Sequence, residues 1–118
     1  MRKAILCFVF GLLYFSMSTT GFSAENINLV VVGGPQGGAW YGLAGSLAKE
    51  IEVAIPGVKT SIMPGGGVGN IMLIEKGEAQ LGTTVSHLYK SAVNGTEPYI
   101  GLNAKNLRAL ANIGTSDT

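Results

Sequence analysis

The chain has 118 residues, eight Lys and Arg against seven Asp and Glu, and a formal net charge of +1. This near-neutral balance provides neither the basic stripe of a nucleic-acid-binding protein nor a polybasic membrane patch. With one cysteine, Cys7, and one histidine, His87, the chain lacks the residues for a disulfide or a cysteine- or histidine-rich metal site. We therefore expect no metal, no cofactor and no nucleic-acid partner.

Residues 1–24 are predicted to be a secretory signal peptide. Basic Arg2 and Lys3 precede an apolar stretch, residues 4–15, and small polar residues lead to cleavage after Ser23 or Ala24. The stretch is shorter than the about 20 apolar residues of a transmembrane helix, so the mature protein is not expected to span a membrane. Cys7 is removed with this segment. Export without a disulfide favours a periplasmic protein.

The exported part, residues 25–118, alternates predicted strands and helices. A nearly continuous aliphatic run, Ile27–Val32, is typical of a strand buried on both faces. Apolar residues then recur at spacings of three or four between Trp40 and Ile55, which predicts a helix that Pro56-Gly57 ends. This period places Trp40 in the core. A second strand is expected over Val58–Met63.

The second half of the exported part continues the alternation. It has a helix over 68–76 ended by Gly77, a strand over 80–84, a helix over 88–94 capped by Ser86 and ended by Gly95, a loop over 96–105, and a strand over Leu107–Ile113. The order β-α-β-α-β-α-loop-β predicts an α/β fold whose parallel sheet is flanked by helices.

Two glycine-rich turns, residues 33–38 and 65–70, separate a strand from a helix, and residues 83–86 form a third such junction. All three are expected at the carboxyl edge of the sheet, where α/β proteins bind their ligands. Glycine lets backbone N–H groups approach a ligand, and a helix N-terminus favours an anion. We therefore predict a site for a small anionic solute. Its expected residues are Gly37, Gly38, Tyr41, Gly67, Asn70, Thr84 and Ser86.

The glycine turns are not predicted to bind nucleotides. Pro35 and Asn70 each occupy a position where the dinucleotide fingerprint requires glycine, and Ala39 follows Gly38 where a phosphate loop requires lysine. Ser86 and His87 are sequence neighbours without a nearby carboxylate, so they do not form a nucleophile and its base. No catalytic residue is assigned, and the chain is not expected to be an enzyme.

Several side chains have both a structural and a binding interpretation. Tyr41 is expected at the lip of the first turn, where its ring and hydroxyl can contact a ligand, or else as a plain core or surface residue. The amide of Asn70 can bind a ligand or cap its own helix. Arg108 can pair with a ligand carboxylate, although a solvated role is favoured.

Four sequence blocks resemble the TAXI-type solute-binding subunits of TRAP transporters. They occur in that family's order and spacing: Gly37-Gly38-Ala39-Trp40-Tyr41, Pro64-Gly65-Gly66-Gly67-Val68-Gly69-Asn70-Ile71, Lys76-Gly77-Glu78-Ala79-Gln80-Leu81-Gly82 and Asn106-Leu107-Arg108-Ala109-Leu110-Ala111.

The resemblance implies a type II periplasmic binding protein, in which two α/β lobes enclose a cleft. Its solute would be a small carboxylate such as an amino acid or dicarboxylate, passed to a sodium-coupled TRAP membrane permease. Family pocket residues correspond to Gly38, Tyr41, Asn70 and Ser86, whereas His87 departs from the polar or acidic residue common in the family. Family members are longer, so residues 25–118 resemble the amino-terminal part of lobe one. The alternatives are the binding protein of an ABC importer and an exported enzyme on a doubly wound fold.

Overall fold

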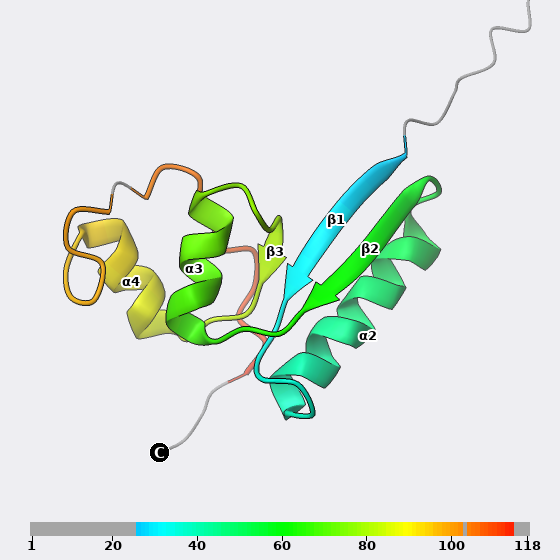
Figure 1. Ribbon diagram of the computed structural model, residues 1–118, viewed down its shortest axis with the longest axis horizontal. Coiled ribbons are helices and arrows are strands. Elements are labelled where there is room, and N and C mark those ends of the chain that lie inside the picture. The colour runs from blue at the N-terminus through cyan, green and yellow to red at the C-terminus, as the bar shows by residue number, and fades with distance from the viewer. Residues whose placement is uncertain (1–25, 103, 115–118) are drawn as a thin grey trace, which may run out of the picture.

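The computed structural model describes residues 26–102 and 104–114, so the predicted signal peptide lies outside the described residues. The elements follow in the order β1 (Ile27–Val32), α2 (Ala39–Ala54), β2 (Val58–Met63), α3 (Gly67–Glu75), β3 (Leu81–Gly82) and α4 (Ser86–Asn94). Figure 1 shows the three strands side by side with helices packed around them. The predicted α/β fold with a parallel sheet and flanking helices is confirmed. Within the described residues, no helix has the length and apolar character needed to cross a membrane.

The sheet has the strand order β2-β1-β3, and both pairings are parallel. β1 and β2 pair along their whole length, from Ile27 opposite Val58 to Val32 opposite Met63. β3 pairs with β1 only through its two residues. The connection from β1 to β2 runs across the sheet in one direction, and the connection from β2 to β3 runs back in the other. Because both crossovers are right-handed, α2 and α3 lie on opposite faces of the sheet. All three strands point their carboxyl ends to the same edge, as Figure 1 shows.

Two apolar clusters form the core of the described residues. Val31 packs with Ala44 and Ala48 of α2, and all three are almost completely buried. The other cluster comprises Ile71, Ala92, Tyr99 and Leu107, so it joins α3 and α4 to the segments that follow them. Burial along β1 increases toward its carboxyl end, where Val31 and Val32 are buried, whereas Ile27 and Asn28 are exposed. The prediction of a strand buried on both faces is therefore correct only for the end next to the first glycine turn.

The third strand is shorter than predicted because a side chain takes over part of its ladder. Gln80 donates its backbone N–H to the Val30 carbonyl at 3.0 Å, and its side-chain Oε1 accepts the Val30 N–H at 2.8 Å. These bonds occupy both backbone groups of Val30 before regular pairing begins at Leu81. Regular strand pairing therefore begins one residue later than predicted, and it ends at Gly82 instead of residue 84.

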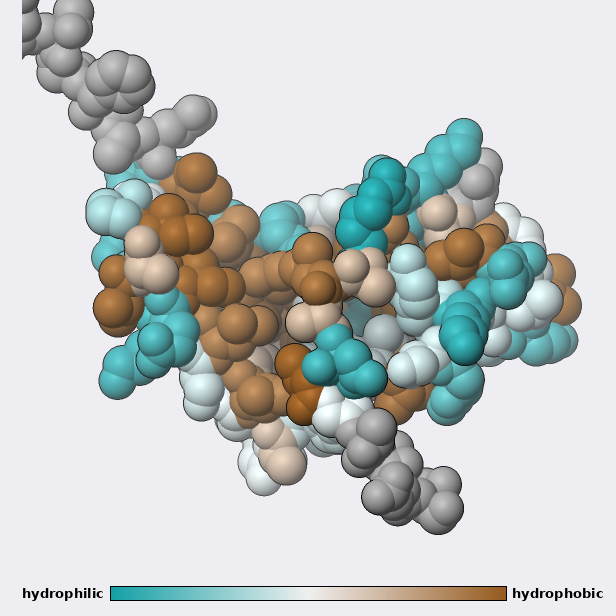
Figure 2. All heavy atoms as spheres, turned by 180° about the vertical axis from the view of Figure 1, so that it is seen from behind, coloured by the Kyte–Doolittle hydropathy of each residue, from teal (hydrophilic) through white to brown (hydrophobic). Residues whose placement is uncertain are grey.

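Helix α2 buries a narrower face than the apolar period predicts. Its two buried residues are Ala44 and Ala48, whereas Leu43 and Leu47 remain 40% and 43% exposed. The helix lies against β1 and β2 through its small residues, so the larger side chains extend past the strands. Figure 2 shows apolar side chains gathered on the side of the molecule that carries α2.

Two further predictions about elements are wrong. Residues 107–113 do not form a strand, because the backbone N–H groups of Asn106 and Leu107 bind the Glu75 carboxylate instead of a neighbouring strand. Ser86 does not cap α4: it is the first helical residue, the cap position belongs to Val85, and α4 therefore begins two residues earlier than predicted. Gly95, in the left-handed conformation with φ of 65°, ends α4 as expected.

Candidate functional site

A hollow of about 120 Å³ lies at the carboxyl edge of the sheet. Residues from all three strand-to-helix junctions line it: Gly33, Gly34, Pro35, Trp40, Gly66, Gly67, Asn70, Thr83, Thr84 and Val85. Sites that enclose a whole small molecule typically measure about 300–1,000 Å³. The size of this hollow therefore suits contact with part of a solute. The prediction that both glycine turns and the third junction meet at one edge is correct.

The side chain of Asn70 connects the three junctions to one another. Its Nδ2 donates to the carbonyl of Gly33 at 2.8 Å and to that of Thr83 at 2.7 Å. Its Oδ1 accepts the N–H of Gly66 at 3.0 Å. Both amide hydrogens are thereby used, and only 1% of the residue is exposed. Asn70 caps the start of its own helix, as one interpretation proposed, and also holds the first and third junctions.

The first glycine turn lies in direct contact with the first turn of α2. A Cβ on Gly33 would lie 2.7 Å from the Trp40 carbonyl oxygen, and one on Gly34 would lie 2.9 Å from the Trp40 Cβ. No side chain fits between the turn and the helix. Gly37, with φ of 83°, and Gly38, the residue before α2, complete the reversal of the chain.

The second turn packs as tightly against Asn70. A Cβ on Gly65 would overlap the Oδ1 of Asn70 and would lie 3.2 Å from the Gly33 carbonyl oxygen. The Gly65 N–H also donates to the Gly34 carbonyl at 3.0 Å, which continues the β1–β2 ladder into both turns. In the third junction, Thr84 donates its hydroxyl to the Gly67 carbonyl at 3.0 Å.

Three helices, α2, α3 and α4, begin at these junctions, and each contributes to the lining or has its cap residue there. In none of the three does the cap residue supply a side-chain hydrogen bond to its helix, although Asn70 accepts the N–H of Gly66, and no acidic residue occupies a first turn. The first N–H groups of a helix have no partner within it, and the helix dipole places partial positive charge there. The edge of the sheet thus carries backbone donors from three directions without a carboxylate to occupy them.

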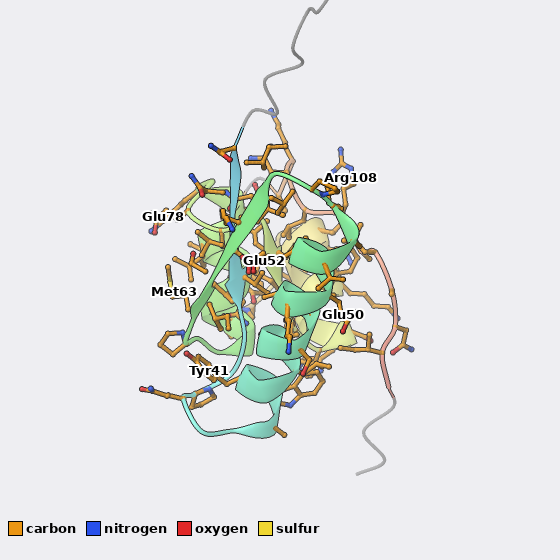
Figure 3. The ribbon with its side chains drawn as sticks, turned by 90° about the vertical axis from the view of Figure 1, so that its right-hand side faces the viewer. Tyr41, Glu50, Glu52, Met63, Glu78 and Arg108 are labelled. Atoms are coloured by element: carbon orange, nitrogen blue, oxygen red, sulfur yellow. The ribbon has the colours of Figure 1, made fainter. Side chains whose placement is uncertain are left out.

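The structure separates the predicted site residues into two groups. Gly67, Asn70 and Thr84 line the hollow. Gly37, Gly38, Tyr41 and Ser86 lie beside it, in the turn before α2 or in the first turns of α2 and α4, without lining it. Tyr41 is half-buried at the start of α2, where Figure 3 shows it.

Trp40 is the residue that the sequence misplaced. It is 44% exposed and lines the hollow, although its spacing from Leu43 and Ala44 predicted a core position. The helical period alone does not tell whether Trp40 is buried or exposed. The buried residues of α2 are Ala44 and Ala48, which lie at one side of the apolar face that the period predicts. Gly33, Gly34 and Gly66 were also missed as lining residues, although they belong to the turns that were identified.

Charged and metal-binding groups are absent from this lining. Arg108 is exposed and donates its Nη1 to the carbonyls of Lys105 and Leu107, at 2.9 and 2.6 Å. Figure 3 shows it at the end of the molecule opposite Tyr41, so the favoured solvated role agrees with its position. His87 is exposed in the first turn of α4. Among residues 26–102 and 104–114, no group of three metal-binding side chains comes together.

Comparison with known proteins gives one family. Residues 31–117, from the second half of β1 onward, match the NMT1-like family, which is of the periplasmic-binding type. Comparisons with curated proteins and with solved structures gave no match. The match covers both glycine turns, the hollow and most of the chain, so the chain belongs to the NMT1-like family of extracytoplasmic solute-binding proteins.

Proposed function

We propose that the protein is the extracytoplasmic solute-binding component of a TRAP-type (TAXI) transporter and that it captures a carboxylate-bearing solute in the periplasm. Family membership supports solute binding in general. The four sequence blocks that resemble TAXI proteins favour this narrower assignment. The protein binds its solute reversibly and passes it to the membrane permease, without catalysis.

The observation that carries the proposal is the group of three helix N-termini around the hollow, none of which has an acidic residue in its first turn. A carboxylate placed there accepts hydrogen bonds from backbone N–H groups and interacts favourably with three helix dipoles. Such bonds to an ionised acceptor are stronger than those between neutral groups. Since Gly66 and Gly67 have no side chain, the solute can approach the backbone of α3 closely.

Because the donors belong to the backbone, their positions depend on the packing of the junctions. Asn70 holds the three junctions together, and Thr84 ties the third one to the start of α3. Both side chains therefore hold the junctions around the hollow before the solute arrives. Preorganised donors lower the cost of ordering on binding.

Calorimetric titration of the purified protein with 4-methylpentanoate and with its uncharged amide tests the anion site. The two probes have the same carbon skeleton, so a difference between them reports the carboxylate. We expect the acid to bind at least tenfold more tightly. Equal affinities, or binding of neither probe, would contradict a carboxylate site.

Uptake by cells that express the protein with its own membrane partners tests the transporter class. We expect uptake of a radiolabelled carboxylate to stop when external Na⁺ is replaced by K⁺. If uptake continues without Na⁺ but stops when ATP is depleted, the protein serves an ABC importer, and the TRAP assignment is wrong.

A further inference from the structure

We infer that the solute is a monocarboxylate with an apolar body, a branched aliphatic or aromatic acid, and that Trp40 determines this preference. The inference rests on the proposed carboxylate site and adds the chemistry of the rest of the solute. It follows from the side chains around the hollow and from the position of the indole ring.

The first argument is the lining itself. Its side chains are those of Pro35, Trp40 and Val85, two threonines and the already bonded Asn70, and the remainder is glycine backbone. Thus Lys, Arg, Asp and Glu are all missing from it. A second carboxylate on the solute would find no cation here, and an α-ammonium group would find no carboxylate. Burying an unpaired charge is costly, so this wall disfavours both.

The second argument is that three backbone carbonyls of the junctions already have partners. The carbonyls of Gly33 and Thr83 accept from Asn70, and the Gly67 carbonyl accepts from Thr84. An ammonium group would have to compete with these bonds. The backbone N–H groups at the helix starts remain as donors, and one carboxylate suffices to occupy them.

The third argument concerns Trp40. The contacts of Gly33 and Gly34 fix the Trp40 backbone and Cβ against the first turn. The side chain nevertheless stays 44% exposed at the hollow. A large aromatic side chain held by its base and open to solvent at a site provides an apolar surface for a ligand. The body of the solute then packs on the indole while the carboxylate binds the helix starts.

The test compares 4-methylpentanoate with leucine, which differs by the α-ammonium group, and with pentanedioate, which carries a second carboxylate in place of the two methyl groups. Affinities come from calorimetry. The emission of Trp40 gives a second readout, because Trp40 is the only tryptophan of the chain. We expect 4-methylpentanoate to bind at least tenfold more tightly than either competitor and to shift the emission to shorter wavelength.

Variants at Trp40 identify the source of the preference. An aromatic face that covers roughly 55 Å² of apolar solute surface changes affinity about tenfold. Trp40→Ala should therefore weaken 4-methylpentanoate about tenfold and pentanedioate less than twofold, and Trp40→Phe should keep most of the affinity. Val53→Ala, at a 73% exposed position of the same helix, is the matched control. Circular dichroism verifies that all variants fold.

The outcomes separate this inference from the function on which it rests. If leucine or pentanedioate binds as tightly as 4-methylpentanoate, or Trp40→Ala weakens all three acids equally, the inference is wrong while the carboxylate site stands. If the acid binds no better than its amide, the carboxylate site itself is wrong.

Discussion

Asn70 occupies the one position from which a single side chain reaches all three junctions. Its amide supplies two donors and an acceptor, and the structure gives each a backbone partner from a different junction. Aspartate would lack the donors, and a shorter side chain would not reach the first turn. Its neighbour Ile71 is buried in the cluster with Tyr99 and Leu107. The site is thereby linked directly to the core.

Asn70→Ala should lower the free energy of unfolding by roughly 2–4 kcal/mol, because it leaves two carbonyls and one N–H without their partner in a buried setting. Gly69→Ala is the control: it changes the preceding residue of the same helix, and its Cβ meets nothing within 4 Å. Alanine is about 1 kcal/mol better than glycine within a helix, so this variant should be more stable than the parent. Urea denaturation followed by circular dichroism measures both. If Asn70→Ala were as stable as Gly69→Ala, the hydrogen bonds of Asn70 would make no net contribution to the free energy of unfolding.

The adjacent glycines of the second turn should respond differently to the same substitution. Gly65→Ala places a methyl group on the Asn70 amide and should cost about 1–3 kcal/mol, the usual penalty of overpacking. Gly66→Ala meets nothing within 4 Å, and its φ of −165° is extended backbone that alanine adopts, so its effect should stay within about 0.5 kcal/mol. Thermal unfolding of the two proteins makes the comparison. A tolerated Gly65→Ala would mean that Asn70 can move aside without cost.

At the scale of elements, β2 is an open edge of the three-stranded sheet, and α2 covers part of it. Glu52 accepts the Thr60 backbone N–H at 2.6 Å and also the Thr60 hydroxyl at 3.0 Å. Figure 3 shows Glu52 between α2 and the strands, whereas Glu50 lies on the outer side of the helix. A carboxylate that occupies an N–H of an edge strand hinders pairing with another chain, so this contact both holds α2 and protects the edge.

This contact should make stability depend on pH. The backbone hydrogen bond from Thr60, then that from its hydroxyl, and nearby Lys59 lower the pKa of the Glu52 carboxyl below its ordinary value of 4.5. In the unfolded chain the group takes up its proton near the ordinary value, and in the folded protein it does so only at lower pH. The stabilisation is therefore complete above pH 4.5 and is lost as the pH falls through the lowered pKa.

Glu52→Gln should accordingly be less stable than the parent at pH 7, and the difference should shrink below pH 4.5. Glu50→Gln, which removes the same charge from the outer side of α2, is the matched control and should show no such convergence. Urea denaturation at pH 7, 5, 4 and 3 gives the comparison. A constant difference between parent and Glu52→Gln over this range would contradict a role for the ionised carboxylate.

The elements differ in how far their sequence determines them. The boundaries of β1 and β2 could be predicted to the residue. An aliphatic run ended by glycine predicts β1, and a partly alternating run between Pro56-Gly57 and Pro64 predicts β2. The buried face of α2 could not, since periodicity identifies which residues share a face but not how much of it the sheet covers. For the same reason Trp40 was assigned to the core. The three junctions could be placed at one edge from topology alone, but the bonds of Asn70 span 37 residues and have no sequence signal.

At the scale of the whole molecule, residues 104–107 are attached to α3 by one side chain. The Glu75 carboxylate accepts the N–H groups of Asn106 and Leu107 at 3.0 and 2.9 Å. The Asn106 amide donates to the Glu75 carbonyl at 3.2 Å. Leu107, 6% exposed, then enters the cluster of Ile71, Ala92 and Tyr99. The contact that replaces the predicted fourth strand thus completes one of the two cores.

Removing this carboxylate should release the segment without unfolding the sheet. In Glu75→Ala, the Asn106 and Leu107 amides should exchange with solvent at least tenfold faster, since a hydrogen bond to a charged group contributes about 1.5–3 kcal/mol. Val31 and Val32, in the central strand, should keep their protection, because they pack on other elements. Glu75→Gln retains an oxygen acceptor and should restore most of the protection, whereas Glu78→Ala, at an exposed position, should change nothing. Hydrogen exchange measured by NMR distinguishes the cases. If Leu107 stays protected in Glu75→Ala, then its burial beside Ile71 and Tyr99 holds the segment, and the carboxylate only orients it.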